Sequence, residues 1–306
     1  MHRNHPERYT HPHTGLVDSA KNELRDFLTS RRARVRPADV GLPEGEGRRV
    51  AGLRREELAM LAGVSVDYYV RLEQGRSRNV SESVLDAVAR ALQLSPTERV
   101  HLVDLARPAT AKRRRPARRQ RVRPAVLTLL SSLDTQPAFV MGDRMDVLAS
   151  NAMARALMGE FLSAQGGYPN LARYVFLDPA AQDLHDDWPA VAEETVAMLR
   201  FYAGRHQDDA ELSRLVGDLS LGSPEFGRFW SAHDVRSRAF GVKVYRHPLV
   251  GPITLNYEAL EFPSDGEQRL CVYGAEPGSP SAESLRLLSS LCAPALETDR
   301  VVPPGT

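Results

Sequence analysis

Apolar residues in the first third of the chain recur every three or four positions, which is the spacing of a buried helix face. Leu24, Phe27 and Leu28 show this spacing near the start of the stretch. The same spacing is shown later by Val84, Leu85, Val88, Ala89 and Leu92. The run Ser95–Glu98 combines a capping box with proline at the first helical position, so a last helix is expected to begin there. Residues 19–107 are therefore predicted to form an all-α domain.

The second half of the chain mixes helical and strand-like patterns. A helix is expected to begin near Pro124, and short strands are expected at Ala138–Met141 and Met145–Ala149. Further helices are predicted at Asn151–Met158, Pro189–Arg205, Asp209–Leu219 and Ser281–Leu291. Further strands are predicted at Phe240–His247, Ile253–Phe262 and Leu270–Ala275. Strands in hairpin order with helices between them predict an α+β domain over residues 124–297.

Three segments outside these domains lack apolar periodicity. Residues 1–18 hold four histidines and two prolines, which suits either a metal-binding tract or a disordered tail, and we favour the tail. Residues 108–123 are rich in arginine and contain prolines, so a basic linker is expected there, serving as a solvated hinge or binding phosphates. Residues 298–306 are expected to form a second tail.

The composition narrows the class of protein. Of the 306 residues, 42% are hydrophobic and 26% are charged, both ordinary for a globular protein. No run approaches the roughly 18 apolar residues of a membrane span, and the polar N-terminus lacks the apolar core of a signal peptide. Cys271 and Cys292 form no C-x-x-C motif, which argues against a disulfide scaffold and a cysteine zinc site. We expect a cytoplasmic protein with no metal and no cofactor.

Charge is distributed unevenly along the chain. Residues 1–123 carry 26 Lys and Arg against 15 Asp and Glu, whereas residues 124–306 carry 14 against 24. The resulting net charges of +11 and −10 nearly cancel in the whole chain, whose net charge is +1. A basic first half joined to an acidic second half indicates a polyanion-binding module beside a module with another task.

The segment Arg55–Gln74 carries the strongest local signal. Its sequence, REELAMLAGVSVDYYVRLEQ, places Gly63 at a sharp turn between two short helical patterns, and Ser65 can cap the second one. Residues expected to face inward are Leu58, Ala59, Ala62, Tyr69 and Leu72. Val66, Asp67, Tyr68 and Arg71 are left on the outer face of the second helix. Two helices joined in this way form a helix-turn-helix.

At these residues the chain resembles the lambda-repressor-like regulators of the Cro/C1 or xenobiotic-response-element (XRE) family. The resemblance rests on E-E-L-A at Glu56–Ala59, G-V-S at Gly63–Ser65 and R-L-E-Q-G at Arg71–Gly75. Tyr69 departs from the family, which usually has an aliphatic residue there. The long segment Arg36–Gly52 is similar to that of one subgroup, the MmyB-like regulators, which carry a C-terminal ligand-binding domain related to PAS folds.

The second half of the chain also resembles the MmyB-like regulators. The motifs that carry this resemblance are Ser223–Phe226, Trp230–Arg236, His247–Gly251, Asn256–Leu260 and Ala275–Ser279. The resemblance implies a transcription regulator with a five-helix helix-turn-helix domain, followed by an α+β PAS-like domain. It further implies a bacterial cytoplasmic protein that binds double-stranded DNA, is associated with the nucleoid when bound, and does not reach the membrane.

The resemblance assigns a role to each residue around the turn. Arg55 matches a residue that contacts a DNA phosphate at a helix N-terminus, and Ser65 and Tyr68 match further contacts with the DNA backbone. Val66, Asp67 and Arg71 match positions that meet base edges in the major groove. Gln74 and Arg76 match residues that contact the DNA backbone at the end of this helix. Arg32 and Glu73 resemble a buried structural pair that does not touch DNA.

An enzyme is not expected from the second half. Ser231, His233, Asp234 and His185–Asp187 supply nucleophiles and bases, but no G-x-S-x-G elbow is present and neighbours in sequence do not form a triad. His185–Asp187 also lacks a second histidine at a metal-ligand spacing. An enzyme with a DNA-binding appendage therefore remains the weaker alternative.

The ligand of the second half is expected to be an apolar small molecule, since no phosphate loop or metal cluster is recognisable. The MmyB-like resemblance implies something like a fatty acid. Candidate lining residues are Trp188, Phe201, Phe226, Trp230 and Tyr257. The alternative is a solid core that serves only as a dimerisation or protein-interaction module. A homodimer is expected in either case, because one helix-turn-helix unit reads a short stretch of DNA.

Overall fold

The fold was taken from a computed structural model of the chain. The structure describes residues 13–43, 48, 50–77, 79–106, 120–163, 168–236, 239–262 and 268–298. The chain divides into two compact units. The first comprises residues 1–114 together with 203–209, and the second comprises 115–202 together with 210–306.

The first unit is built from helices, which confirms the predicted all-α class. Five α-helices and one short 3₁₀ helix are described here: α1 (His13–Arg34), η1 (Pro37–Val40), α2 (Arg55–Ala62), α3 (Val66–Glu73), α4 (Glu82–Ala91) and α5 (Pro96–Ala106). Their core contains Phe27, Leu58, Leu72, Val88 and Leu102, all nearly inaccessible to solvent. Ser81 caps α4 and Ser95 caps α5, so local side-chain acceptors set where these helices begin.

The first helix begins earlier than the sequence pattern suggested. Helix α1 starts at His13, whereas residues 1–18 were expected to form a disordered tail. The apolar spacing at Leu24, Phe27 and Leu28 indicated a later part of this helix, where these three side chains are buried. The remainder of the expected tail, most of the basic linker and the tail at 298–306 lie largely outside the described residues.

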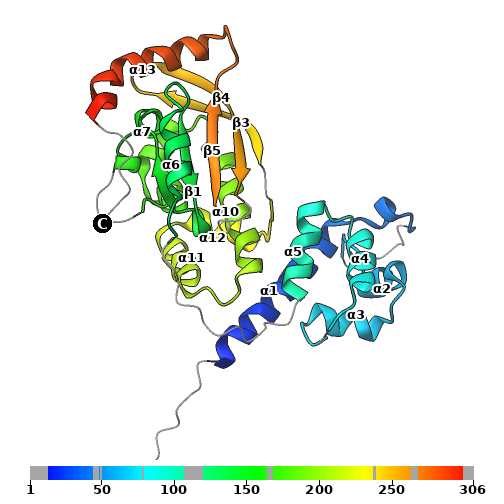
Figure 1. Ribbon diagram of the computed structural model, residues 1–306. Coiled ribbons are helices and arrows are strands. Elements are labelled where there is room, and N and C mark those ends of the chain that lie inside the picture. The colour runs from blue at the N-terminus through cyan, green and yellow to red at the C-terminus, as the bar shows by residue number, and fades with distance from the viewer. Residues whose placement is uncertain are drawn as a thin grey trace, which may run out of the picture. The chain divides into compact units, whose positions relative to one another are not determined.

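The second unit combines helices with one five-stranded sheet, as predicted (Figure 1). Its strands are β1 (Ala138–Met141), β2 (Val147–Ser150), β3 (Phe240–His247), β4 (Gly251–Glu261) and β5 (Arg269–Gly274). Its α-helices are α6 (Pro124–Ser131), α7 (Ala152–Met158), α8 (Leu171–Leu177), α9 (Pro179–Leu184), α10 (Trp188–Arg205), α11 (Ala210–Gly222), α12 (Pro224–Ser231) and α13 (Pro280–Thr298). Two 3₁₀ segments are η2 (Asp143–Met145) and η3 (Gly159–Ser163).

Every strand pair in the sheet is antiparallel, in the order β2-β1-β5-β4-β3. The N-terminal hairpin therefore lies beside the last strand, and the helices between β2 and β3 connect the two edges of the sheet. This arrangement confirms the expected α+β class. The short strand β1 (Ala138–Met141) pairs with β2 on one side and β5 on the other. All four of its residues are buried.

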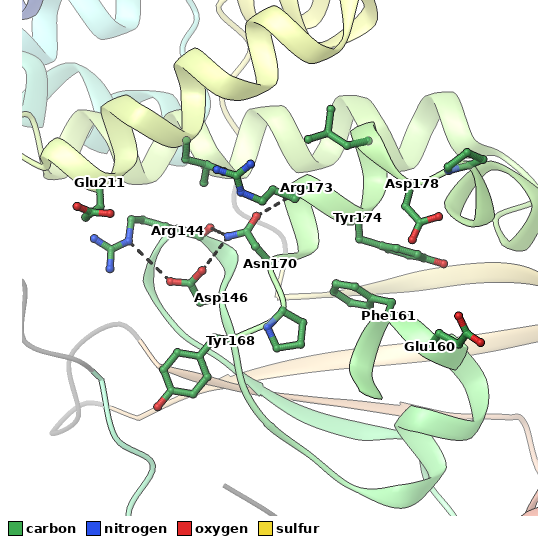
Figure 2. A pocket seen from close by; sticks show the side chains of 14 residues that line it. Arg144, Asp146, Glu160, Phe161, Tyr168, Asn170, Arg173, Tyr174, Asp178 and Glu211 are labelled. Atoms are coloured by element: carbon green, nitrogen blue, oxygen red, sulfur yellow. Dashed lines mark hydrogen bonds and ion pairs between the residues drawn. The ribbon is translucent and has the colours of Figure 1, made fainter. Parts of the chain in front are cut away.

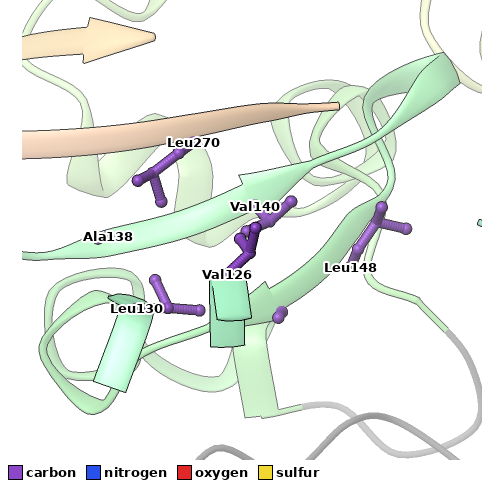
Figure 3. Packing of buried hydrophobic residues seen from close by; sticks show 7 residues of the cluster. Val126, Leu130, Ala138, Val140, Leu148 and Leu270 are labelled. Carbon is purple, nitrogen blue, oxygen red and sulfur yellow. The ribbon is translucent and has the colours of Figure 1, made fainter. Parts of the chain in front are cut away.

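The two faces of the sheet pack against different helices. On one face, Val126 and Leu130 of α6 contact Ala138, Val140 and Leu270, and these residues form a dry cluster (Figure 3). Alternate residues of the same strands, including Phe139, Cys271 and Tyr273, point to the opposite face. The opposite face is where the cavity described below is found.

The turn between the first two strands differs from its prediction. A strand was expected from Met145, but β2 begins at Val147. Arg144 and Met145 both have positive φ, 56° and 67°, so the chain reverses through left-handed backbone before pairing resumes. This reversal sends Arg144 and Met145 to two different hollows of the domain.

Candidate functional sites

The turn between α2 and α3 is built by backbone geometry and one cap. Gly63 has φ 67° and ψ 30°, a left-handed conformation that side chains with a Cβ rarely adopt. The amides of Gly63 and Val64 bond back to the carbonyls of Met60 and Ala59, which closes α2. Ser65 Oγ then accepts from the amide of Tyr68 at 3.2 Å and starts α3. These contacts hold the two short helices at a sharp angle.

Helix α3 has one buried face and one face open to solvent. Tyr69 and Leu72 are fully buried against the rest of the unit. The residues predicted to meet DNA all lie outside the core: Arg55, Ser65, Val66, Asp67, Arg71 and Arg76 are exposed, and Tyr68 and Gln74 are half-buried. The structure thus brings Val66, Asp67 and Arg71 together on one accessible surface, where they can contact another molecule.

Two residues of this open face are paired with each other. Arg71 Nη1 lies 3.2 Å from Asp67 Oδ2, one helical turn away, and both side chains are exposed. An exposed pair of this kind contributes only about 0.3–0.5 kcal/mol, so it orients the guanidinium without holding it firmly. The ion pair with Asp67 therefore positions the Arg71 side chain along the helix surface. It is weak enough to be broken when another partner approaches.

Glu73 is the polar centre of the first unit. Its carboxylate is 1% exposed and accepts from Thr29 Oγ1 at 2.9 Å, Arg32 Nη2 at 3.3 Å and Arg55 Nε at 3.0 Å. Burial alone would raise the pKa of this carboxyl, but the bonds from Arg55, Arg32 and Thr29 outweigh burial and lower it. Glu73 is therefore a buried charge with three donors from α1 and α2.

The predicted buried pair of Arg32 and Glu73 is present, and Arg32 Nη1 also donates to the carbonyl of Leu53 at 2.8 Å. The tie between Arg55 and Glu73 was not predicted from the sequence. Arg55 gives Nε and Nη2 to the carboxylate while half of its side chain remains exposed. The role of Arg55 as a phosphate contact stays a prediction. The structure adds that the ion pair with Glu73 sets the position of its guanidinium.

The second unit contains a small cavity of about 60 Å³ on the face of the sheet opposite α6. Its lining is mainly apolar and includes Met141, Met145, Met158 and Met198, four of the seven methionines in the chain. Tyr245, Tyr257 and Tyr273 form the sheet side. Methionine side chains are unbranched and adapt their shape readily, so this lining can accommodate molecules larger than the present volume.

One ion pair lies in the wall of the cavity. Lys243 Nζ donates to Glu194 Oε2 at 2.6 Å, and Tyr257 Oη donates to the other carboxylate oxygen at 2.8 Å. Lys243 also lies over the ring of Tyr257, 5.3 Å from its centroid. The two opposite charges are therefore compensated within the wall.

His185 is a further polar residue in the lining of the cavity. It is 4% exposed, and its ring packs against Tyr245 and Tyr174 at centroid distances of 5.2 and 6.4 Å. Burial, with a smaller effect of the positive charge on Lys243, lowers the pKa of His185 to about 4. The imidazole is therefore neutral at physiological pH.

The predicted lining residues are found in more than one place. Tyr257 lines the cavity. Phe226 is fully buried and contacts Trp230 and Phe176 at 5.5 and 5.1 Å, and Trp188 packs on Phe176 at 6.1 Å. Phe201, on α10, is half-buried. The other four predicted residues are not among those that line the cavity, and Trp188, Phe226 and Trp230 form an aromatic cluster with Phe176.

Most of the lining was missed by the sequence reasoning, although one signal was available. Lys243, Tyr245, Tyr257 and Tyr273 all occupy inward positions in strands that alternate with period two. Tracing that alternation from the buried tyrosines would have placed Lys243 on the same face. His185 was noted only as a base or metal ligand, since its position depends on how α9 packs on β3.

A second, open hollow of about 730 Å³ is lined by both charged and apolar side chains (Figure 2). Asn170 donates to Asp146 Oδ1 at 2.9 Å and to the carbonyl of Arg144 at 2.8 Å, while Arg144 lies 3.8 Å from Asp146. Arg173, also in the lining, is paired with Asp218. Arg144, Asp146 and Arg173 therefore each have a partner of opposite charge.

Within the described ranges, no three His, Cys, Asp or Glu residues are gathered as a metal ion would require. Among the same residues, no helix combines the length and the apolar character needed to cross a bilayer.

Comparisons with known proteins agree with this division of the chain. The family model of the MmyB-like transcription regulator ligand binding domain matches residues 122–288. A helix-turn-helix domain model matches residues 23–102. No match to a curated protein was found. The two matched regions contain, respectively, the cavity and the open face of α3.

Proposed function

Because the chain belongs to the family of MmyB-like transcription regulators, we propose that it binds a specific operator and that a small apolar ligand in its second domain modulates this binding. The two family matches support a DNA-binding transcription regulator with a ligand-binding domain. We further propose that it acts in the bacterial cytoplasm, by binding rather than by catalysis.

The observation that carries the DNA-binding proposal is the open face of α3. Arg71, Asp67 and Val66 are exposed on one helix that a capped, glycine-closed turn presents to solvent. An arginine fork matches guanine O6 and N7, an aspartate can accept from cytosine N4, and a valine can touch a thymine methyl group. These three side chains are therefore proposed to read base edges in the major groove.

Five other residues are proposed to contact the DNA backbone. They are Arg55, Ser65, Tyr68, Gln74 and Arg76, each exposed or half-buried around the two helices. Arg55 stands at the N-terminus of α2, where the helix dipole adds positive potential. Backbone contacts fix the register of the protein on DNA, while the three base contacts supply its sequence preference.

Replacing Arg71 by alanine is expected to weaken operator binding by about 1–3 kcal/mol and to relax the preference at one base pair. The reason is the loss of a bidentate guanine contact. Binding should be measured on a library of operator variants at fixed salt concentration. Arg90→Ala, at an exposed position of α4, is the matched control and should leave base preference unchanged. Uniform weakening without a change of preference would instead make Arg71 a phosphate contact.

The cavity supports a ligand whose bulk is apolar. We propose a fatty-acid-like molecule, since tyrosine, methionine and aliphatic side chains dominate the lining. The present volume of about 60 Å³ is well below the several hundred cubic ångströms typical of ligand sites, so binding requires the methionines to move. The competing function is a dimerisation or protein-interaction module without ligand.

We propose that the second domain also forms a homodimer through the outward face of β3. Phe240, Val242 and Val244 alternate on this face, and Val242 is 61% exposed. Strand β3 is also an edge strand of the described sheet, so the side of its backbone turned away from β4 pairs with no further strand there. A second copy is the proposed occupant, because a two-fold pair of helix-turn-helix units doubles the number of base pairs read.

Val242→Lys is expected to shift the protein toward monomer, raising the dimer dissociation constant by more than about tenfold, because a charge would enter the proposed apolar contact. Sedimentation analysis would measure this change, and operator affinity should fall in parallel. Leu221→Lys is the control, since Leu221 is 91% exposed on α11, away from β3. Equal behaviour of both variants would place the dimer contact elsewhere.

A further inference from the structure

His185 is held at a fixed point of the cavity wall. It follows the last residue of α9, and its amide bonds to the carbonyl of Ala181 at 3.1 Å. The amide of the next residue, Asp186, bonds to the carbonyl of Val244 in β3 at 3.1 Å. These backbone bonds fix where the side chain of His185 starts, and packing against Tyr245 and Tyr174 holds the buried ring in the wall.

The two ring nitrogens of His185 are not bonded to any described part of the protein. Both Nδ1 and Nε2 are buried without a hydrogen-bond partner. A neutral imidazole has one N–H donor and one bare nitrogen acceptor. Buried polar atoms in folded proteins are almost always bonded to something. The ring therefore offers one donor and one acceptor to whatever occupies the cavity.

The charges in the lining do not favour an anion. Glu194 and Lys243 are the two ionisable acid and base side chains there apart from His185, and they are bonded to each other. The thiol of Cys271 is also uncharged, since burial raises its pKa to about 12. A ligand carboxylate would have to enter without a spare positive charge, or displace Glu194 from Lys243. An uncharged oxygen meets neither obstacle.

We propose that the ligand of this cavity ends in an uncharged hydrogen-bonding group, a hydroxyl or a carbonyl oxygen, which His185 recognises. The inference rests on the proposed ligand-binding function and refines it. The apolar remainder of the molecule contacts the methionines and the tyrosine rings. The protein thus selects an alcohol, ester or ketone over the corresponding ionised fatty acid.

Binding of 1-decanol and of decanoate to the full-length protein at pH 7.5 tests this proposal. The probes share a chain length, and decanoate is ionised at this pH because ordinary carboxyl pKa values lie near 4. Both tryptophans, Trp188 and Trp230, belong to the second domain, so tryptophan fluorescence during thermal unfolding reports this domain alone. A bound ligand raises the melting temperature in a concentration-dependent way.

Two variants assign the preference to His185. His185→Phe keeps a planar ring and removes both nitrogens, and it is expected to weaken 1-decanol binding about two- to tenfold, the loss of one net hydrogen bond. His185→Gln retains a donor and an acceptor and covers the case in which phenylalanine packs poorly. It should retain more of the preference than phenylalanine. Met198→Leu is the control in the same lining and should change both probes alike.

Stronger binding of 1-decanol than of decanoate, reduced in His185→Phe, is the expected result. Stronger binding of decanoate, or an alcohol-to-acid ratio that is unchanged in His185→Phe, would overturn the assignment of the polar end while leaving the proposed ligand site intact. Absence of binding by both probes would overturn the apolar-ligand part of the proposed function, and this inference with it.

Discussion

Replacing Glu73 by alanine is expected to reduce the unfolding free energy of the helix-turn-helix domain by about 3–5 kcal/mol, the usual cost of removing one partner from a buried ion pair. The carboxylate accepts from Thr29, Arg32 and Arg55, and none of these donors has an equivalent acceptor once it is gone. Arg32 is the most affected, since its side chain is itself mostly buried. Operator binding should fall as the folded fraction falls.

Chemical denaturation followed by circular dichroism measures this effect. Glu82→Ala is the control, because Glu82 is an exposed acid at the start of α4 and its loss should cost less than about 1 kcal/mol. A loss below about 1 kcal/mol for Glu73→Ala would mean that water replaces the carboxylate without strain. It would then also leave Arg55 available to DNA without its present anchor.

The same residue predicts how stability changes with pH. The folded pKa of Glu73 lies below the ordinary value of 4.5, so its contribution is fully present above that value and is lost as the pH falls through the folded pKa. In the Glu73→Ala variant this part of the acid-induced loss should disappear. Comparing unfolding free energies between pH 6 and pH 3 would show the difference.

Phe226→Ala is expected to destabilise the ligand-binding domain by about 3–5 kcal/mol, as usual for truncating a buried phenylalanine. Phe226 is fully buried, stacks on Trp230 and meets the edge of Phe176, so its removal leaves a hole among three elements. The sequence interpretation placed Phe226 in the ligand site. The contacts instead predict a loss of stability with ligand affinity preserved in the folded fraction.

Unfolding in denaturant, followed by tryptophan fluorescence, would separate these two roles. Leu221→Ala serves as the control, since this side chain is almost fully exposed and its truncation should change stability by less than about 0.5 kcal/mol. If Phe226→Ala kept its stability but lost its response to 1-decanol, Phe226 would belong to the ligand site after all.

The sequence predicted best the elements whose signals are local. Strands Ala138–Met141 and Phe240–His247 have the predicted bounds, because β-rich runs that end at turn residues mark where a strand stops. The turn at Gly63 and the cap at Ser65 were also predictable from the sequence, since each requires a particular residue type at one position. Helices α8, α9 and α12 were missed, although Asn170, Asp178 and Ser223 cap them.

What the sequence could not predict depends on contacts between distant segments. Arg55 and Glu73 are 18 residues apart, and no periodicity relates them. Lys243 and Glu194 are 49 residues apart and meet only because α10 packs on the inner face of the sheet. The position of His185 likewise follows from α9 docking on β3. The exposed residues Val66, Asp67 and Arg71 belong to one short helix, so their exposure was predictable in a way that the cavity was not.

The ion pair between Arg71 and Asp67 has a consequence for the rate at which such a regulator would find its operator on DNA. If this face reads base edges as proposed, the neutral Arg71–Asp67 pair would contribute little to the sequence-independent attraction between arginines and phosphates. Separating the two side chains costs only about 0.3–0.5 kcal/mol, whereas a good guanine contact returns about 1–3 kcal/mol. Under this proposal Arg71 would stay paired with Asp67 at an unmatched base pair and would leave it at a matching guanine. Short dwell times on unmatched DNA would follow.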